Sequence, residues 1–397
     1  MNVHGAGQRP PRGLRASLTV DDVRRAARRR VPRAVFDFVD GGADDEITMA
    51  RARRAFDEVV LLPDVLRDVA TVDTAVAIGG RASALPIAIG PTGYTGLLHP
   101  DGERAVSRAA AAAGIPYTLS TMGTRTIAEV RGDLPDAAVF FQLYFWKDRA
   151  RQDALVAEAI EHRVDALVVT VDMAVGGARR RDLRRGLSMP PRISLPLVVD
   201  GALHPAWALG YLRRPPAFVS LAPGGSRSIA EVADLMFDPG ADRASLERLR
   251  GQWPGRLIVK GVLTPRAARE AVAVGADEVV VSNHGGRQLD RAPAALECVA
   301  RVRDAVGDGV AVHLDGGVRS GADVAAAVGL GADSVWLGRA ALYGLMAGGE
   351  AGVALVLRLL ADQLAATMRL LGAARLSTLP GHVALGAVRS AESRLSE

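Results

Sequence analysis

Residues 282–290 have the side-chain types of an acid–base site. They read SNHGGRQLD and follow a short apolar run. The unperturbed pKa of histidine, about 6.5, suits proton abstraction near neutral pH. Two glycines after His284 leave its ring uncovered, and Arg287 follows three residues later. A lone histidine is more often a structural residue, but this context predicts a base beside an anion clamp.

Two glycine–arginine segments, at residues 315–321 and 338–339, have the composition of a phosphate site. Glycines let backbone amides approach a phosphate closely, and arginine adds a fork of hydrogen-bond donors. Glycines that only form tight turns are the alternative, but two such segments favour phosphate binding. The candidate residues are Asp315, Gly316, Gly317, Arg319, Gly338 and Arg339.

Other apolar runs also end in residues that could line a site. Lys260 is the last residue of the predicted strand at residues 257–260. A lysine buried at a strand end needs an anionic partner, because burying its charge unpaired costs free energy. Residues 90–93 form a turn whose backbone could line a flat ring. Two further runs end in polar side chains, which are Gln142, Tyr144, Thr170 and Asp172.

Eight apolar runs alternate with alanine-rich helical patterns from residue 85 onward. Strands are predicted at residues 85–89, 117–120, 138–143, 166–171, 257–260, 278–282, 310–314 and 334–337. Helices are predicted at residues 102–113, 153–162, 265–274, 294–306, 322–328 and 351–371. Continuous apolar strands are typical of parallel sheets covered on both faces. The pattern predicts an α/β TIM (β/α)8 barrel, whose sites lie at the carboxyl ends of the strands; a doubly wound open sheet is the alternative.

Two regions fall outside this repeat. Residues 17–80 predict two helices and a short strand-like segment, as a helical extension that closes the bottom of the barrel. Residues 173–256, after the fourth strand, are too long for an ordinary connection and predict an inserted excursion or lid. The predicted domain spans residues 17–377, between mobile tails at residues 1–16 and 378–397.

Composition excludes several protein classes. With 49% hydrophobic residues among 397, the chain can bury a core and is not disordered. Residues 1–15 lack the apolar region of a secretory signal, and no uninterrupted apolar stretch reaches about 18 residues. The single cysteine, Cys298, fits a reducing compartment. The net charge of +5 comes from arginine without a nucleic-acid-binding motif, and we predict neither nucleic-acid binding nor a metal site.

Four separate segments resemble the FMN-dependent 2-hydroxy-acid dehydrogenase and oxidase family, which includes glycolate oxidase and L-lactate dehydrogenase. They are SNHGGRQLD at residues 282–290, DGGVR at 315–319, FQLY at 141–144 and VKG at 259–261. The resemblance covers roughly residues 20–375. It looks closest to the (S)-mandelate dehydrogenase branch, through GPTG at residues 90–93 and neighbouring matches.

The resemblance implies an FMN site on the residues already singled out. Pro91, Thr92 and Gly93 would lie against the flavin ring, and Ser120, Gln142 and Thr170 would bond its polar edge. Lys260 would stabilise the reduced ring, and Ser282 would contact the cofactor near the ribityl chain. The glycine–arginine residues at 315–319 and 338–339 would hold the ribityl chain and the phosphate.

The resemblance also implies the substrate residues. Arg179 and Arg287 would clamp the carboxylate of a 2-hydroxy acid, and Tyr144 would bond the substrate. His284 would be the base, with Asp172 orienting its imidazole. The family usually has a tyrosine where this chain has Phe38. Loss of that hydroxyl disfavours lactate and glycolate, and we expect an aryl or otherwise bulky acid such as mandelate.

The resemblance says less about the electron acceptor and about where in the cell the protein lies. Gly93 resembles the dehydrogenases, which favours a quinone-like acceptor over oxygen, so an oxidase is the first alternative. A non-redox phosphate-binding barrel and an FMN-binding protein without activity are the others. Residues 190–242 resemble in place the membrane anchor of mandelate dehydrogenase, with a soluble lid as the equal alternative. We expect a cytoplasmic protein, either soluble or peripheral at the inner membrane face, and the family implies a homo-oligomer, a tetramer.

Overall fold

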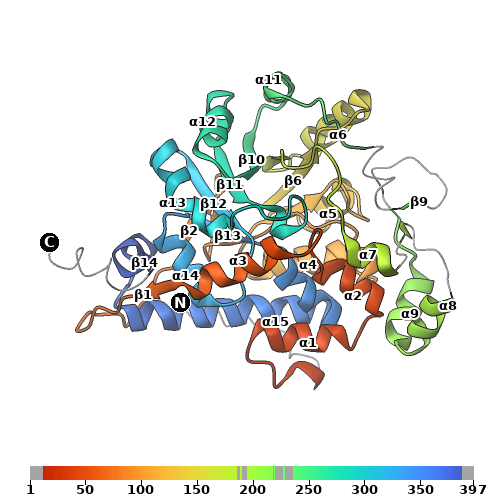
Figure 1. The fold of residues 1–397 in the computed structure, drawn as a ribbon, viewed down its shortest axis with the longest axis horizontal. Helices are drawn as coiled ribbons and strands as arrows, with labels where there is room; N and C mark the ends of the chain where they lie inside the picture. Colours follow the sequence, from red (N-terminus) through yellow and green to blue (C-terminus); the bar gives the residue numbers. More distant parts are fainter. Residues whose placement is uncertain are drawn as a thin grey trace.

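The structure is a computed structural model that describes residues 12–185, 188–189, 195–217, 219, 227–228 and 236–386. Its centre is a closed barrel of eight parallel strands, in the spatial order β10-β11-β12-β13-β4-β5-β6-β7 (Figure 1). The strands are β4 (Ile87–Ile89), β5 (Tyr117–Ser120), β6 (Val139–Tyr144), β7 (Ala166–Thr170), β10 (Arg256–Val262), β11 (Glu278–Ser282), β12 (Ala311–Asp315) and β13 (Ser334–Leu337). The TIM barrel is therefore confirmed, and the open sheet is excluded.

The strands form where the apolar runs predict them. Every residue of β6 and β7 is buried, because the barrel interior covers one face and the helices cover the other. Three predicted strands match residue for residue, at 117–120, 278–282 and 334–337. The fifth strand of the repeat, β10, is longer than predicted and includes Gly261.

A helix follows each barrel strand and packs on the outside. The outer helices are α4 (Gly102–Ala112), α5 (Ile127–Asp133), α6 (Arg149–Glu161), α11 (Arg243–Gln252), α12 (Pro265–Ala273), α13 (Ala295–Val306), α14 (Gly321–Gly329) and α15 (Arg339–Leu371). Local capping explains several starts: the side chains of Thr126 and Ser320 accept hydrogen bonds from the third residue of α5 and α14. These caps lie directly after the loops that follow β5 and β12.

The last helix begins earlier than predicted. The sequence predicts a helix at residues 351–371, whereas α15 starts at Arg339 and is broken at Gly348 and Gly349. Gly349 has φ 59°, a left-handed conformation that glycine adopts readily. The helix is long and apolar enough to cross a membrane, but most of its apolar stretch is buried inside the protein, as in the core helix of a globular domain.

The N-terminal extension covers both ends of the barrel, which corrects the prediction that it closes the bottom. The hairpin of β2 (Val76–Ile78) and β3 (Arg81–Ser83) closes the bottom, where the backbone amide of Gly79 donates to Glu278 at 3.0 Å. The extension has three helices instead of two, α1 (Val20–Arg28), α2 (Arg33–Asp40) and α3 (Ile47–Asp57). The α2–α3 loop lies at the opposite end, because the amide of Ala43 donates to the Gly286 carbonyl after β11.

Ordered structure also extends past both predicted domain boundaries. Leu14, in the short helix η1 (Arg12–Leu14), is buried in the core and anchors a segment that was expected to be a tail. At the other end, β14 (Val383–Leu385) pairs antiparallel with β1 (Val59–Leu61) after the short helix η4 (Leu376–His382). The rest of the predicted tails, residues 1–11 and 387–397, lies outside the described residues.

The excursion after β7 contributes helices beside the mouth of the barrel. Besides α11, its described elements are α7 (Arg180–Arg185), β8 (Ser188–Met189), α8 (Leu195–Ala202), α9 (Pro205–Arg213) and β9 (Arg227–Ser228). The α7, α8 and α9 helices occupy the right-hand side of Figure 1. The indole nitrogen of Trp207 in α9 donates to the Leu97 carbonyl at 2.7 Å, which ties this segment to the loop after β4.

Candidate active site

A cavity of about 400 Å³ opens at the carboxyl ends of the barrel strands. This is the end at which TIM barrels place their sites. All of the residues that the sequence predicts for the site line this cavity, except Ser120, Gln142, Thr170, Asp172 and Ser282. Ser120, Gln142, Thr170 and Ser282 lie in the last residues of β5, β6, β7 and β11, and Asp172 follows β7. The structure therefore brings all of the predicted residues to one end of the barrel.

His284 is held in the cavity by an unusual backbone turn. Its φ is 57°, and Gly285 and Gly286 follow with φ of 63° and 71°. A Cβ at Gly286 would lie 2.7 Å from the backbone nitrogen of Met49, so the second glycine is needed for close packing against α3. A non-glycine residue in the left-handed region is strained, and such strain is typical of functional sites. The turn directs the imidazole toward Asp172, where Nδ1 and Oδ1 are 3.1 Å apart.

Burial favours a neutral His284 in this pair. Burial lowers the pKa of His284 below its ordinary value, and the charge of Asp172 offsets only part of that effect. Burial acts to raise the pKa of Asp172, but His284 and Lys260 outweigh it and the pKa is lowered. Near neutral pH the carboxylate therefore accepts the Nδ1 hydrogen, and Nε2 keeps the lone pair that a base requires.

Lys260 has the anionic partner that its burial requires. Its Nζ lies 2.7 Å from Oδ2 of Asp315 and donates to Oγ of Ser282 at 3.0 Å. Ser282 in turn donates to Asp315 at 2.7 Å. These three residues come from β10, β11 and β12, whose registers bring their ends to one level. The ammonium group is thus fixed at the base of the cavity.

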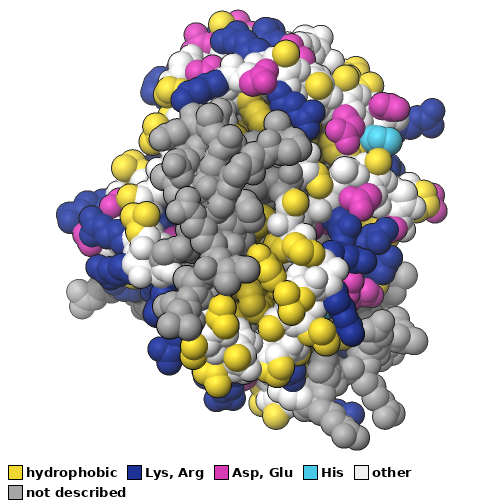
Figure 2. All heavy atoms as spheres, turned by 90° about the vertical axis from the view of Figure 1, so that its right-hand side faces the viewer, with side chains coloured by type: hydrophobic (Ala, Val, Ile, Leu, Met, Phe, Trp, Pro, Cys, Tyr) yellow, Lys and Arg dark blue, Asp and Glu magenta, His cyan; other side chains and the backbone are white. Residues whose placement is uncertain are grey.

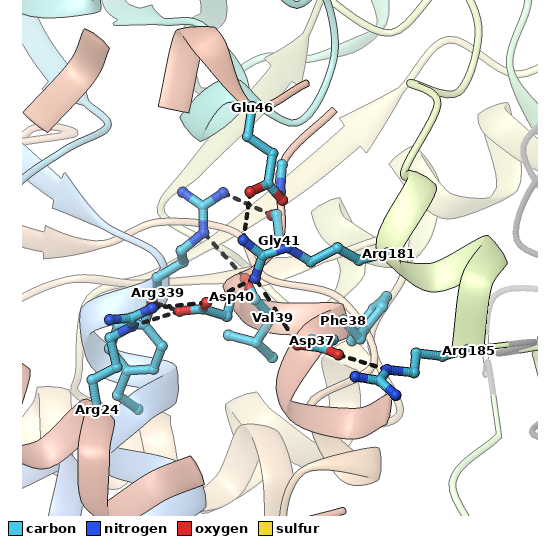
Figure 3. Close-up of polar contacts among 12 residues, drawn as sticks. Arg24, Asp37, Phe38, Val39, Asp40, Gly41, Glu46, Arg181, Arg185 and Arg339 are labelled. Carbon is cyan, nitrogen blue, oxygen red and sulfur yellow. Dashed lines mark hydrogen bonds and ion pairs between the residues drawn. The ribbon is translucent and has the colours of Figure 1, made fainter. Parts of the chain in front are cut away.

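Four arginines, Arg179, Arg287, Arg319 and Arg339, line the cavity and make it electropositive. Burial lowers the pKa of Arg179, Arg287 and Arg339, and for Arg287 repulsion from the other two lowers it further. Arg287 and Arg339 donate to backbone carbonyls at the C-terminal end of α2, including that of Gly41 at 2.8 and 2.9 Å (Figure 3 shows Arg339). These carbonyls orient the guanidinium groups without neutralising their charge, which suits the binding of anions.

Asp182 is a site residue that the sequence did not reveal. It lines the cavity, is only 4% exposed, and its Oδ2 has no hydrogen-bond partner within the described part of the chain. Burial raises its pKa to about 6, and the charges of Arg287 and Arg179 only partly oppose this. The one local signal was an acid directly after three arginines, at residues 179–182.

The rest of the cavity wall is apolar. Phe38 lies 5.6 Å below the guanidinium carbon of Arg287, and Phe237 packs edge-on against Tyr144 with ring centroids 5.0 Å apart. Met122, Met173, Leu183 and Leu342 complete this wall. Phe38 and Tyr144 are predicted from the sequence, but Phe237 is not, because it comes from the excursion, where no strand pattern indicates its place.

Polar atoms that suit an FMN lie without a partner on one cavity-lining residue and on two residues at neighbouring strand ends. Gln142 Nε2, Thr170 Oγ1 and Thr92 Oγ1 are buried without a hydrogen-bond partner among the described residues. Such atoms match the polar edge of a flavin ring, because buried polar groups are normally satisfied. Gly316 and Gly317, with φ of 118° and 87°, expose backbone beside Arg319, as a phosphate site requires.

Comparisons with known proteins agree with this geometry. The family model described as "FMN-dependent dehydrogenase" matches residues 27–385. A putative L-lactate dehydrogenase of Mycobacterium tuberculosis is 46% identical over 94% of this chain and 90% of its own length. The (S)-mandelate dehydrogenase of Pseudomonas putida is 38% identical over 91% of this chain and 92% of its own length. The crystal structure of the monotopic membrane protein (S)-mandelate dehydrogenase superposes with a TM-score of 0.88 at 36% identity, covering 93% of this chain and all of that one.

Proposed function

The chain belongs to the FMN-dependent dehydrogenase family, and from that premise we propose that it oxidises an aryl or otherwise bulky 2-hydroxy acid to the 2-oxo acid and passes the electrons to a quinone-like acceptor. The family makes the protein an FMN-dependent oxidoreductase that acts on CH–OH groups. The observation that supports the proposal is that His284, which contacts the carboxylate of Asp172, lines one cavity with Arg179 and Arg287.

In the proposed reaction some of the cavity residues bind the substrate and others transfer its proton. The substrate loses two electrons and two protons, and bound FMN would accept both electrons and the proton that His284 does not take. Arg179 and Arg287 hold the carboxylate and so orient the carbinol carbon. His284 takes one proton on Nε2, and Asp172 stabilises the imidazolium that results. The positive charge of Lys260 favours negative charge on a reduced ring.

The proposed substrate class rests on the cavity wall. Phe38 gives the wall a ring without a hydroxyl, and the side chains of Met122, Phe237 and Leu342 extend the apolar surface. An aryl group buries more apolar area there than a methyl group does. The names of the relatives divide between lactate and mandelate, so substrate preference must be measured on this protein.

We expect mandelate to reduce the flavin faster than lactate does. The measurement is the anaerobic bleaching of the visible flavin spectrum, with both acids at the same concentration. A Phe38→Tyr variant is the matched comparison, because the added hydroxyl should improve kcat/KM for lactate about fivefold, a gain of about 1 kcal/mol. Faster reduction by lactate in the unaltered protein would exclude the aryl preference. Reoxidation by air as fast as by a quinone would instead favour the oxidase.

A lipid-soluble acceptor would fit the exposed face of the excursion. Val198, Val199, Leu203, Leu209 and Leu212, on α8, α9 and the turn between them, are about half or more exposed. Figure 2 faces this side of the molecule and shows hydrophobic side chains gathered beside Lys and Arg side chains. Apolar side chains flanked by cations favour binding to an anionic membrane surface. We therefore propose peripheral contact with a membrane through α8 and α9.

The Leu203→Gln/Leu212→Gln double variant should reduce binding to anionic liposomes. Each leucine is 74% exposed, so the substitutions remove apolar contact area without opening the core. The readout is the fraction of protein that floats with the vesicles. Leu370→Gln on α15, at a position 77% exposed, is the control that should behave as the unaltered protein does. Equal flotation of all three proteins would remove the membrane proposal.

A further inference from the structure

The short helix α7 carries part of the cavity wall but lies outside the barrel. Arg179 comes directly before it, and Asp182 and Leu183 within it line the cavity. A helix of six residues is not stable by itself, because few of its backbone hydrogen bonds are internal. The position of α7, and with it the position of Arg179, therefore depends on contacts with other elements.

Those contacts are ionic and are made with α2 and the α2–α3 loop. Three arginines of α7 face acids there, and Figure 3 shows the pairs of Arg181 and Arg185. The pairs are Arg180 with Asp44 at 3.2 Å and with Asp45, Arg181 with Asp40 at 3.1 Å and with Glu46, and Arg185 with Asp37 at 2.9 Å. The backbone amide of Asp44 also donates to the carbonyl of Ala178, at 2.8 Å, next to Arg179. We call this set the α2–α7 clamp.

Arg181 is the central residue of the clamp. One end of its guanidinium contacts Asp40 and the other contacts Glu46, so it spans the end of α2 and the start of α3. Glu46 has φ 63° and also accepts from the amide of Gly42, at 2.9 Å. A strained backbone at this position indicates that the loop conformation is determined by its contacts.

Asp40 connects the clamp to the rigid part of the protein. Its side chain is 5% exposed and accepts from Arg24 of α1 at 2.6 Å and from the hydroxyl of Tyr343 of α15 at 2.8 Å. Burial acts to raise the pKa of Asp40, but the hydrogen bonds from Arg24 and Tyr343 outweigh it and lower the pKa to about 2. Asp40 is thus an anion that is fixed to two other helices, and through Arg181 it connects α7 to α1 and α15.

The same end of α2 also meets the cavity arginines. The carbonyl of Val39 accepts from Arg339 at 3.1 Å, and the carbonyl of Phe38 accepts from Arg287 at 3.0 Å. One face of this short segment therefore orients Arg287, while its acids hold the helix that follows Arg179. The positions of both proposed carboxylate ligands, Arg179 and Arg287, therefore depend on contacts with the C-terminal end of α2.

We propose that Arg181 is a positioning residue for substrate capture: its bridge between Asp40 and Glu46 holds α7 on α2 and so places Arg179 over the cavity. This inference rests on the proposed function, because it assigns Arg179 to the substrate carboxylate. Arg181 does not line the cavity, so its effect is indirect. It sets the affinity for the carboxylate and leaves the chemistry at His284 unchanged.

The test compares Arg181→Gln, Arg181→Lys and Arg184→Gln in the FMN-loaded enzyme. Arg184 is exposed on the same helix and makes no ion pair with a residue that the structure describes, so it is the matched control for loss of one charge. For Arg181→Gln we expect KM for the 2-hydroxy acid to rise about tenfold, because loss of orientation weakens binding, with kcat changed less than about twofold. Arg181→Lys should recover part of the affinity, and Arg184→Gln should match the unaltered enzyme.

A second readout does not depend on turnover. Amide hydrogen exchange at residues 180–185 should be faster in Arg181→Gln than in the other two variants, and adding the 2-oxo acid product should slow it in the unaltered protein. Unchanged KM and unchanged exchange in Arg181→Gln would overturn the inference, as would an equal rise of KM in Arg184→Gln. A fall in kcat without a change in KM would also overturn it. If none of the proteins oxidises a 2-hydroxy acid, the proposed function fails, whereas fast exchange in Arg181→Gln alone would still show that the clamp holds α7.

Discussion

Replacing His284 with asparagine should lower kcat for 2-hydroxy-acid oxidation by about a thousandfold or more, the range expected when a general base is lost. Asparagine fits the space of the imidazole but cannot take a proton near neutral pH. The bond between Nδ1 and Asp172 shows that the ring is already oriented for this task. The measurement is the rate of anaerobic flavin reduction at saturating substrate, together with the visible spectrum, which should show that FMN remains bound.

The pH profile of the unaltered enzyme gives a second check on the same residue. Because burial lowers the pKa of His284, the imidazole stays neutral down to a pH below the ordinary value of about 6.5. Flavin reduction should therefore be constant above that value and fall as the pH drops through the lowered pKa. His162→Asn, at the far end of α6, is the control histidine and should change neither rate nor profile. A His284→Asn enzyme within tenfold of the unaltered rate would exclude the base.

Replacing Arg287 with lysine should lower kcat/KM for a 2-hydroxy acid at least about 100-fold, or about 3 kcal/mol. Lysine keeps the charge but cannot bond the carbonyls of Phe38 and Gly41 and a substrate carboxylate at the same time. The substitution therefore removes the correct hydrogen-bond geometry and not the charge, and we expect it mainly to weaken binding of the substrate carboxylate.

A substrate without a carboxylate shows whether the Arg287→Lys substitution acts on carboxylate binding or disturbs the whole site. Mandelamide has no carboxylate charge, so the ratio of kcat/KM between unaltered enzyme and Arg287→Lys should be much smaller for it than for mandelate. Arg301→Lys, at an exposed position on α13, is the matched control and should leave both substrates unaffected. If Arg287→Lys lowered kcat/KM equally for the acid and the amide, Arg287 would not be a carboxylate ligand.

Much of the site could be predicted because its signals are local. His284, Gly285, Gly286 and Arg287 are consecutive, so one stretch of sequence displays the base, the turn and the cation together. The need of Lys260 for an anion also follows from its place at the end of an apolar run. The identity of that anion, Asp315, does not follow, because the two residues meet only through the register of β10, β11 and β12.

The sequence alone predicted the eight strands and the residues at their ends, because the apolar runs and the turns between them are properties of neighbouring residues. Closure of the strands into a barrel instead of an open sheet was decided by the tertiary structure. The tertiary structure alone decided which parts of the N-terminal extension cover each end of the barrel, how Asp182 and Phe237 reach the cavity, and how Arg181 joins Asp40 to Glu46. These features depend on charged and aromatic side chains far apart in the chain, and no local period specifies which acid a given arginine will meet once the chain is folded.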